Sequence, residues 1–466
     1  MRGVRRQRLF VAARAAALAG LCVASMGGAA ATAADANATA GALVAWARSA
    51  AIPLRTVEAR AGHADLAPLA AALGSAPVVA LGEPGHGAHQ PLAFRNRLFR
   101  YLVGHQGFTA IALETSFTEA REIDDFVMGG PGDAATLAKR DLTWGFGSYE
   151  ENVRLIQWMR DYNARAGVRR KLHFYGIDMS GANDDADFTH ADVAVRAVDR
   201  YLRQTSPQYS QRLTTTVAPE LSLMDRVGYW QMARQHERAL NGLLQSLQTY
   251  LVANAPALRR ASSAVDYDWA AHNLEVARQL RDFLRLQTAL EGTSTAIHPL
   301  DYRLDNAREA AMAANVLWAL REEGPHGRLL VFAHDAHVMN GRTRGGMWRV
   351  YKEPPVMMGA RLRARLGARL VIIGTLAAHN GPGLPSGRAT PGSVEAALGS
   401  LGLPLLALDL RKARENSGAN AWLHERRPIR MNFDTQLDVV PARAFDIIIF
   451  IDRVTPAEVS AGRLSR

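Results

Sequence analysis

The segment 81-LGEPGHGAH-89 places an acidic side chain and an imidazole directly after an apolar run. Glu83 and His86 follow 76-APVVA-80, whose small apolar residues are typical of a strand buried on both faces. A turn needs the glycines of this segment, but it has no need of a carboxylate or an imidazole. A histidine held beside a carboxylate is suited to general-base catalysis. The segment therefore predicts the floor of a reactive pocket.

Three later apolar runs also end in side chains that could do chemistry. These side chains are Glu114, Asp178, His334, Asp335 and His337. Because ligands of a parallel sheet bind at the carboxyl ends of its strands, we expect these groups to meet at one edge of the sheet. A structural role stays open for four of them. Glu114 could belong to a buried ion pair, Asp178 could form a turn, and His334 and His337 could cap the start of a helix.

The strands that would position these residues are short apolar runs of the kind found in buried parallel sheets. They cover 76–83, 108–115, 171–178, 328–335, 369–376, 404–411 and 445–452. Helical-period segments separate most of them, including one from Pro91, at its first helical position, to residue 106. The alternation predicts an α/β fold with a mostly parallel central sheet of about seven strands, covered by helices on both faces.

One interval breaks this alternation. Residues from about 185 to 300 contain no apolar strand run, but they include long helical patterns at 230–253 and 269–290. We interpret the interval as a helical insertion that forms a cap or a wall of the site. The rest of 34–466 is expected to form one α/β domain around it.

The first 33 residues have the pattern of a signal peptide. Five arginines precede an apolar stretch of small residues, which ends in Ala31-Thr32-Ala33, a sequence suited to cleavage. Cleavage would remove Cys22, the only cysteine, and leave no stable membrane span. The segment predicts an exported protein, periplasmic or extracellular. An N-terminal membrane anchor is the alternative.

The composition and the absence of certain motifs limit the reactions and partners that this protein is expected to have. The formal net charge is +11, but the Lys and Arg residues are scattered without interleaved aromatic runs, so we predict no nucleic-acid partner. The sequence has no G-x-S-x-G and no H-E-x-x-H, which argues against a serine-elbow hydrolase and a zincin. With no obvious covalent nucleophile, we expect a water molecule activated by histidine, and no cofactor.

Several motifs together resemble the erythromycin esterase family. They are LGE-x-x-HG at 81–87, ALE at 112–114, YGID at 175–178, REAAMAANVLWAL at 308–320 and AH-x-AHV at 333–338. The resemblance runs from about 76 to 376, and more loosely to 452, and it skips the helical insertion. Two spacings match the family: Arg95 lies nine residues after His86, and Glu114 lies thirty-one residues after Glu83.

The resemblance implies a hydrolase that opens a carboxylic ester or macrolactone, with a small-molecule substrate and a role in macrolide resistance. It maps the general base onto His86, with Glu83 and Glu114 nearby. The family's arginine corresponds to Arg95, and its paired histidines to His334 and His337. Asp178 and Asp335 would support these groups. The stretch 88-AHQPL-92 departs from the family, so His89 is expected to alter the wall that faces the substrate.

Two other functions stay open from the sequence. The first is a metal-dependent hydrolase in which His86, His334, His337 and Glu114 hold Zn²⁺, since histidines and a carboxylate form a common catalytic set. The second is a non-catalytic exported protein that binds haem or another hydrophobic ligand on a related α/β scaffold.

Overall fold

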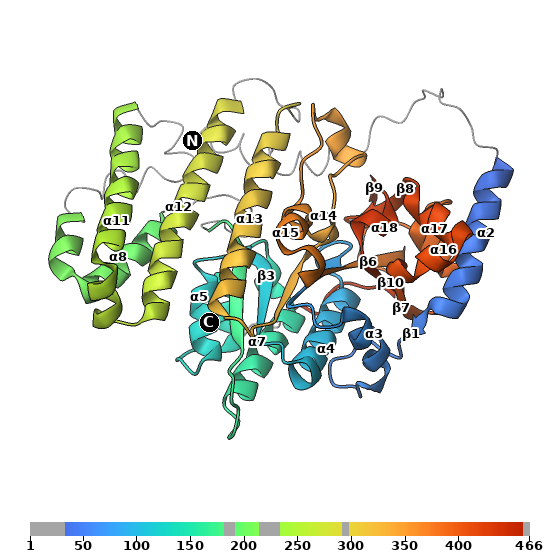
Figure 1. Cartoon of the computed structure of the whole chain (residues 1–466), viewed down its shortest axis with the longest axis horizontal. Coiled ribbons are helices and arrows are strands. Elements are labelled where there is room, and N and C mark those ends of the chain that lie inside the picture. Colours follow the sequence, from blue (N-terminus) through green and yellow to red (C-terminus); the bar gives the residue numbers. More distant parts are fainter. Residues whose placement is uncertain (1–32, 181–191, 214–233, 291–297, 460–466) are drawn as a thin grey trace. The chain divides into compact units, whose positions relative to one another are not determined.

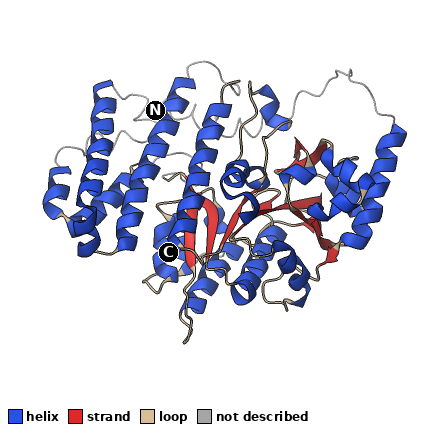
Figure 2. Ribbon diagram, viewed as in Figure 1, coloured by secondary structure: helices blue, strands red, loops and turns tan. Residues whose placement is uncertain are grey.

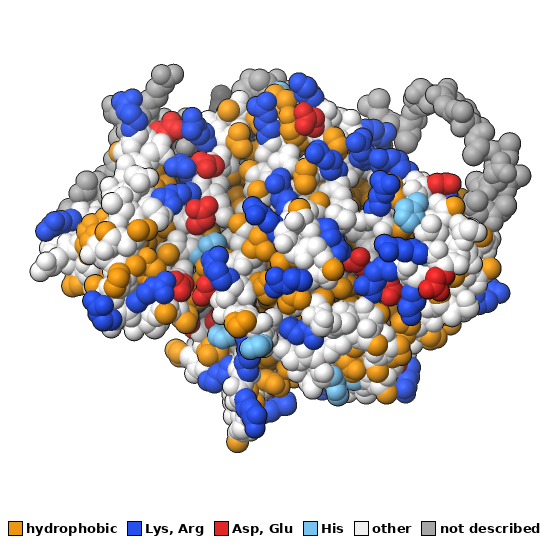
Figure 3. Space-filling model, viewed as in Figure 1, with side chains coloured by type: hydrophobic (Ala, Val, Ile, Leu, Met, Phe, Trp, Pro, Cys, Tyr) orange, Lys and Arg blue, Asp and Glu red, His pale blue; other side chains and the backbone are white. Residues whose placement is uncertain are grey.

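The computed structural model describes residues 33–180, 192–213, 234–290 and 298–459. All but the last residue of the predicted signal peptide therefore lies outside the described residues. Among the described helices, none combines the length and the apolar composition needed to cross a bilayer. On the face shown in Figure 3, Lys and Arg side chains are spread over the surface, with Asp and Glu among them.

An eight-stranded sheet forms the centre of the fold, with the strand order β1-β7-β10-β6-β2-β5-β3-β4 (Figure 1, Figure 2). The strands are β1 Ile52–Pro53, β2 Val78–Glu83, β3 Ala110–Ser116, β4 His173–Asp178, β5 Leu329–His334, β6 Leu370–Asn380, β7 Leu405–Asp409 and β10 Ile447–Val454. The predicted α/β fold with a mostly parallel sheet is confirmed, and each of the seven apolar runs overlaps one strand, although β3, β6 and β10 extend past the ends of their runs.

The sheet differs from the prediction at one edge. The two-residue strand β1 pairs antiparallel with β7, and β7 pairs antiparallel with β10. Pro53 has no N–H to donate, so an edge strand is where it can be accommodated. A strand this short leaves no apolar run, which is why the sequence predicted seven strands and not eight.

The chain divides into two compact units, described in turn. The first contains the described parts of Met1–Gly107, Thr293–Arg303 and Phe332–Ala457. Within it, β6 pairs parallel with both β2 and β10. Every residue of β2 is buried, as its apolar composition requires. Its helices are α2 Ala33–Ala50, η1 Ala64–Leu66, α3 Ala67–Leu73, α4 His89–Gln106, α14 Asp335–Val338, η3 Gly346–Val350, α15 Met358–Leu366, η4 Gly367–Arg369, α16 Val394–Gly399, η5 Leu410–Glu415, α17 Ser417–His424 and α18 Pro441–Ala444.

Helix α4 follows the segment that contains His86. It begins at His89, two residues before the predicted start at Pro91. A proline is tolerated there because the N–H groups of the first turn have no partner within the helix. The helix ends at Gln106, and the next residue, Gly107, has a φ of 69°, in the left-handed region that favours glycine.

A two-stranded antiparallel sheet in the first unit was not predicted. It consists of β8 Arg427–Met431 and β9 Thr435–Val439, joined by a turn of three residues. The sequences RPIRM and TQLDV contain too few consecutive apolar residues to stand out as buried strands. Two of the turn residues, Asn432 and Phe433, have φ values of 48° and 67°.

The second unit contains the described parts of Phe108–Gly292, Leu304–Val331 and Glu458–Arg466. Its strands β3 and β4 pair in parallel. Its helices are α5 Ala120–Val127, α6 Ala134–Asp141, η2 Phe146–Ser148, α7 Glu150–Asn163, α8 Val193–Thr205, α11 Arg234–Ala261, α12 Ala264–Leu290 and α13 Tyr302–Glu322. The described part of the interval from 185 to 300 forms α8, α11 and α12, and α12 packs against the other two (Figure 1).

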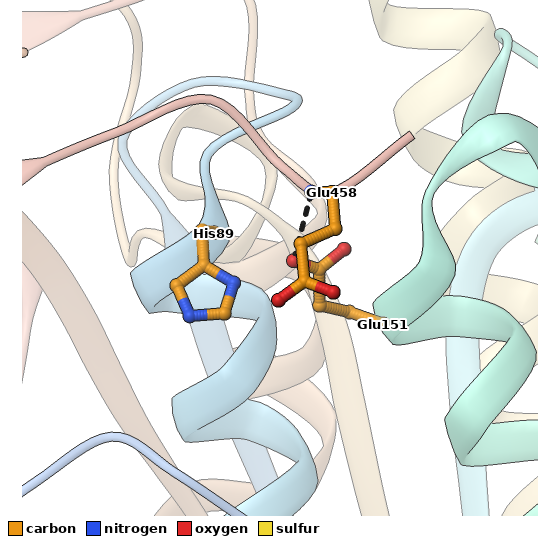
Figure 4. Close-up of side chains that lie close together, drawn as sticks. All are labelled: His89, Glu151 and Glu458. Atoms are coloured by element: carbon orange, nitrogen blue, oxygen red, sulfur yellow. Dashed lines mark hydrogen bonds between the residues drawn. The ribbon is translucent and has the colours of Figure 1, made fainter. Parts of the chain in front are cut away.

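Hydrogen bonds connect Glu458, near the end of the described chain, to the first turn of helix α7. The backbone N–H of Glu458 donates to Glu151 Oε1 at 3.1 Å (Figure 4). The N–H of Glu150 donates to the carbonyl oxygen of Glu458 at 2.8 Å. The carboxylate of Glu151 is buried, so this backbone donor satisfies one of its oxygens.

Candidate active site

Glu83 and His86 form a hydrogen bond at the carboxyl end of β2. Glu83 Oε1 lies 2.8 Å from His86 Nδ1. The carboxylate side chain is 4% exposed, whereas the imidazole is 34% exposed. A carboxylate can only accept, so this contact assigns a proton to His86 Nδ1. In the neutral ring, Nε2 then carries a lone pair, which is the arrangement that a general base needs.

Backbone hydrogen bonds hold the loop that carries His86. The carbonyl oxygen of Gly87 accepts from the N–H of Ala457 at 2.8 Å, and the N–H of His89 donates to the carbonyl of Thr455 at 2.9 Å. Gly87 has a φ of 82°, which a side chain would strain. The glycine therefore has a defined purpose in this loop, as the sequence pattern suggested.

His334 lies at the carboxyl end of β5, close to His86. The two ring centroids are 5.1 Å apart, and the planes are nearly perpendicular. His334 caps the short helix α14, and its Nδ1 accepts from the N–H of Ala336 at 3.2 Å. This bond assigns the proton of the neutral ring to Nε2, which makes that atom a hydrogen-bond donor. The two imidazoles therefore present complementary atoms, a base on one and a donor on the other.

His337 lies beyond His334, with a centroid separation of 6.3 Å from it. Three of the predicted residues, His86, His334 and His337, thus gather with Glu83 at the end of neighbouring segments in the first unit. Among the described residues, no three of these four bring their ligand atoms within 4.8 Å of one another. Any shared metal ion would therefore require the side chains to move closer.

Asp335 is fully buried between β2 and β6. Its Oδ1 accepts from the N–H of Thr375 at 3.0 Å. A Cβ placed on Gly82 would lie 1.9 Å from this oxygen, so only glycine fits there. Burial raises the pKa of Asp335 well above its ordinary value; the Thr375 N–H acts in the opposite direction, and the charges of Glu83 and Glu395 add to the rise. Asp335 supports the floor of the site and does not face the histidine rings through any of these contacts.

Arg95 is also fully buried, on α4. Its Nε and Nη2 donate to Asn96 Oδ1 at 3.0 and 2.8 Å. The guanidinium carbon lies 4.7 Å from the centre of the Phe332 ring, two residues before His334. These contacts place Arg95 against β5, the strand that ends at His334. Its role toward an oxyanion stays a prediction.

His89 makes a different contact from the other histidines. Its Nε2 lies 3.0 Å from Glu58 Oε1, and the Glu58 side chain is 56% exposed. The pair joins the first turn of α4 to the segment before α3. The predicted role of His89 toward the substrate stays a prediction.

In the second unit, Glu114 and Asp178 share one arginine that the sequence analysis missed. Arg308 Nη2 donates to Glu114 Oε1 at 2.8 Å and to Asp178 Oδ2 at 2.5 Å, and its Nε donates to Asp178 Oδ1 at 3.0 Å. Burial alone would lower the pKa of Arg308, but the charges of Asp178 and Glu114 outweigh it and raise the pKa. Of the two glutamates expected beside His86, Glu83 therefore makes that contact, and Glu114 has an arginine as its partner.

Trp144 completes this cluster. Its Nε1 donates to Asp178 Oδ2 at 3.1 Å, and the Arg308 guanidinium lies 5.0 Å from its ring centre. Trp144 has a φ of 64°, an uncommon conformation for a bulky residue. Arg308 begins the run REAAMAANVLWAL that carried part of the family resemblance, and this was the one signal in the sequence that could have identified it.

Comparison with known proteins agrees with these motifs. The family model described as erythromycin esterase matches residues 103–454, a region that contains Glu114, Asp178, Arg308 and His334 and begins after the loop of His86. Erythromycin esterase type II from Escherichia coli is 23% identical over 305 residues, which cover 63% of this chain and 68% of that protein. Erythromycin esterase type I from Escherichia coli is 23% identical over 320 residues, 68% of this chain and 73% of that protein.

A crystal structure of a Bacillus cereus protein has the same fold, with a TM-score of 0.73, 24% identity, and coverage of 90% of this chain and 99% of that one. Since the matched family region spans most of the sequence, the chain belongs to the erythromycin esterase family.

Proposed function

We propose that this protein hydrolyses a carboxylic ester or a macrolactone with a water molecule activated by His86. The observation that carries the proposal is the 2.8 Å bond between Glu83 and His86, which assigns the proton of the neutral ring to Nδ1 and makes Nε2 its basic nitrogen. The names of the similar proteins, erythromycin esterases of types I and II, support an ester or lactone as the substrate class.

In the proposed reaction, His86 Nε2 takes a proton from water as the water oxygen attacks the carbonyl carbon. The negative charge of Glu83 stabilises the imidazolium that forms. A base positioned in this way typically accelerates proton transfer by a factor of about 10² to 10⁴. The carbonyl oxygen becomes an oxyanion, which can accept from His334 Nε2–H. When the tetrahedral intermediate collapses, His86 returns the proton to the leaving alkoxide, giving an acid and an alcohol.

The test uses His86→Ala in the purified protein, assayed against macrolides, simple lactones and aryl esters. We expect the parent to hydrolyse at least one class and the variant to lose about 10² or more of its kcat. His424→Ala is the matched control, because His424 is exposed on α17 and its Nδ1 lies 2.8 Å from the carbonyl oxygen of Asn420 in the same helix. Hydrolysis by His86→Ala near the parent rate would exclude the proposed base.

A metal-dependent hydrolysis is the second candidate, and the contacts of the histidines favour it in one respect. His86 Nδ1 donates to Glu83, as the second ring nitrogen of a metal-ligating histidine commonly does, so its Nε2 could bind a metal. His334 does not share this pattern, because its Nδ1 accepts from the N–H of Ala336 and its Nε2 carries the proton of the neutral ring. A bound Zn²⁺ would activate the water as a Lewis acid. Metal analysis of the purified protein, together with loss of activity on chelation and its return on adding Zn²⁺, would support this candidate over the first.

We also propose that the protein acts after export, because residues 1–33 have the composition of a signal peptide. Expression of the full chain should then yield a periplasmic or secreted product that begins near residue 34. Intact-mass measurement of that product checks the cleavage. A full-length product retained in the cytoplasm would contradict it.

A further inference from the structure

The turn of the β8–β9 hairpin lies directly against the loop that carries His86. The backbone N–H of Asn432 donates to the carbonyl oxygen of Pro84 at 2.8 Å. The ring of Phe433 covers Gly85 so closely that a Cβ at Gly85 would lie 2.9 Å from its Cε2 atom. The first half of the loop, between Glu83 and His86, therefore rests on this turn.

The conformation of the turn is one that the sequence does not favour locally. Asn432 and Phe433 both have left-handed φ values, 48° and 67°. Asparagine adopts this region with some ease, but a phenylalanine there is uncommon and needs support from its surroundings. Since the ring of Phe433 is 7% exposed, its packing against the loop provides part of that support.

Arg430 also supports the left-handed backbone of the turn, through hydrogen bonds. It is 5% exposed, and its Nη2 donates to the carbonyl oxygen of Phe433 at 2.6 Å and to Asn380 Oδ1 at 2.6 Å. Its Nη1 donates to the carbonyl oxygen of Ala378 at 2.8 Å. Asn380 also donates, through Nδ2, to the Phe433 carbonyl at 3.0 Å. One planar guanidinium thus connects the turn to the end of β6, which the ammonium of a lysine could not reproduce.

We propose that the β8–β9 turn is a positioning element for His86, with Arg430 and Phe433 as its positioning residues. The inference rests on the hydrolysis proposed above. The loop contains two glycines, Gly85 and Gly87, so its own backbone is weakly restrained. Residues 455–457 hold the second half of the loop, and the turn holds the first half. A displacement of about 1 Å of a catalytic group can reduce the rate by about 10².

Two variants test the turn without touching the catalytic residues. Phe433→Gly removes the ring and accepts the left-handed backbone, so that the hairpin itself can keep its turn. Arg430→Lys keeps the charge but loses the planar set of donors. Arg427→Lys is the matched control, because Arg427 lies on the same strand and pairs with Glu425. The measurements are kcat, KM, the thermal midpoint, and amide hydrogen exchange at residues 85–88.

We expect Phe433→Gly and Arg430→Lys to lower kcat by about tenfold or more, with KM within about twofold of the parent. Amide exchange at residues 85–88 should become faster, whereas exchange in β3 and β4 should not. Arg427→Lys should change none of these. Unchanged exchange in both variants, or faster exchange with an unchanged kcat, would overturn the proposal.

The outcome also separates this proposal from the proposed hydrolysis. If the parent hydrolysed no ester or lactone, the hydrolysis would be excluded, and the exchange measurement would still decide whether the turn holds the loop. If exchange at residues 85–88 were the same as in the parent in both Phe433→Gly and Arg430→Lys, the turn would have no positioning role, whatever the reaction proves to be.

Discussion

The rings of His86 and His334 lie 5.1 Å apart, and each uses its Nδ1 for a different partner. Glu83 accepts from His86 Nδ1, whereas His334 Nδ1 accepts from the N–H of Ala336. The same side chain is therefore present in two tautomers at one site. In the hydrolysis proposed above, His86 would take a proton from water, and His334 would donate a hydrogen bond to the oxygen that becomes charged.

This difference predicts a large effect of Glu83→Gln. The amide of glutamine carries no charge, and it can rotate to donate to Nδ1, which would favour the wrong tautomer of His86. We expect kcat to fall by about 10² or more while the fold is retained. Steady-state kinetics with circular dichroism check this. Glu58→Gln is the control, since Glu58 contacts His89 in an exposed pair, and an equal loss in both variants would contradict the assignment.

The donor role of His334 predicts the behaviour of His334→Asn. Asparagine can still cap the short helix α14 through its side-chain oxygen, but it does not replace the Nε2–H of the ring. Loss of an oxyanion donor typically costs on the order of 3 kcal/mol of barrier, so kcat should fall by about 10² to 10³ with a smaller change in KM. A change confined to KM would instead indicate that His334 binds the substrate only.

The cluster around Arg308 predicts an effect on stability. Arg308→Met leaves the buried carboxylates of Glu114 and Asp178 without their cation, and unpairing buried charges typically destabilises a protein by about 3–5 kcal/mol. Chemical denaturation of the parent and of Arg308→Met measures the difference in their free energies of unfolding. Arg321→Met on the same helix is the control, since that side chain is 69% exposed, and a similarly small effect in both would rule out a structural ion cluster.

Glu395 predicts a pH dependence of stability. Burial raises its pKa from 4.5 to about 7, against the opposing effects of the Arg430 backbone N–H and charge. Since the folded state holds this proton more tightly than the unfolded state, the contribution of Glu395 to stability is fully present below pH 4.5 and is lost as the pH rises through about 7. The full change corresponds to about 3 kcal/mol.

Glu395→Gln should remove this dependence, because an amide resembles the neutral acid in shape. We expect the variant to match the parent at pH 4.5 and to exceed its free energy of unfolding at pH 8 by up to about 3 kcal/mol. Urea denaturation at the two pH values provides the comparison. Parallel pH profiles for parent and variant would show that this carboxyl does not titrate as stated.

The family and the strands were predictable from the sequence because both leave local signals. Apolar runs buried on both faces mark β2 to β7 and β10, and motifs such as AH-x-AHV place histidines at a strand end. The hydrogen bond between Glu83 and His86 is also local, since the two residues are three positions apart. Short elements without such runs, β1 and the hairpin of β8 and β9, were missed for the same reason.

The order of the strands and the partners of buried charges were decided by the tertiary structure alone. The sequence places Glu114 and Asp178 at the ends of strands, but it does not show that Arg308 is their partner. Arg308 lies 194 positions from Glu114 and 130 positions from Asp178 along the chain. No spacing rule links residues at such distances, because their contact depends on how the strands and α13 pack. The sequence by itself thus determined which chemical groups the strands would carry, whereas packing decided that His86 would face His334 and that Phe433 would lie beneath the loop.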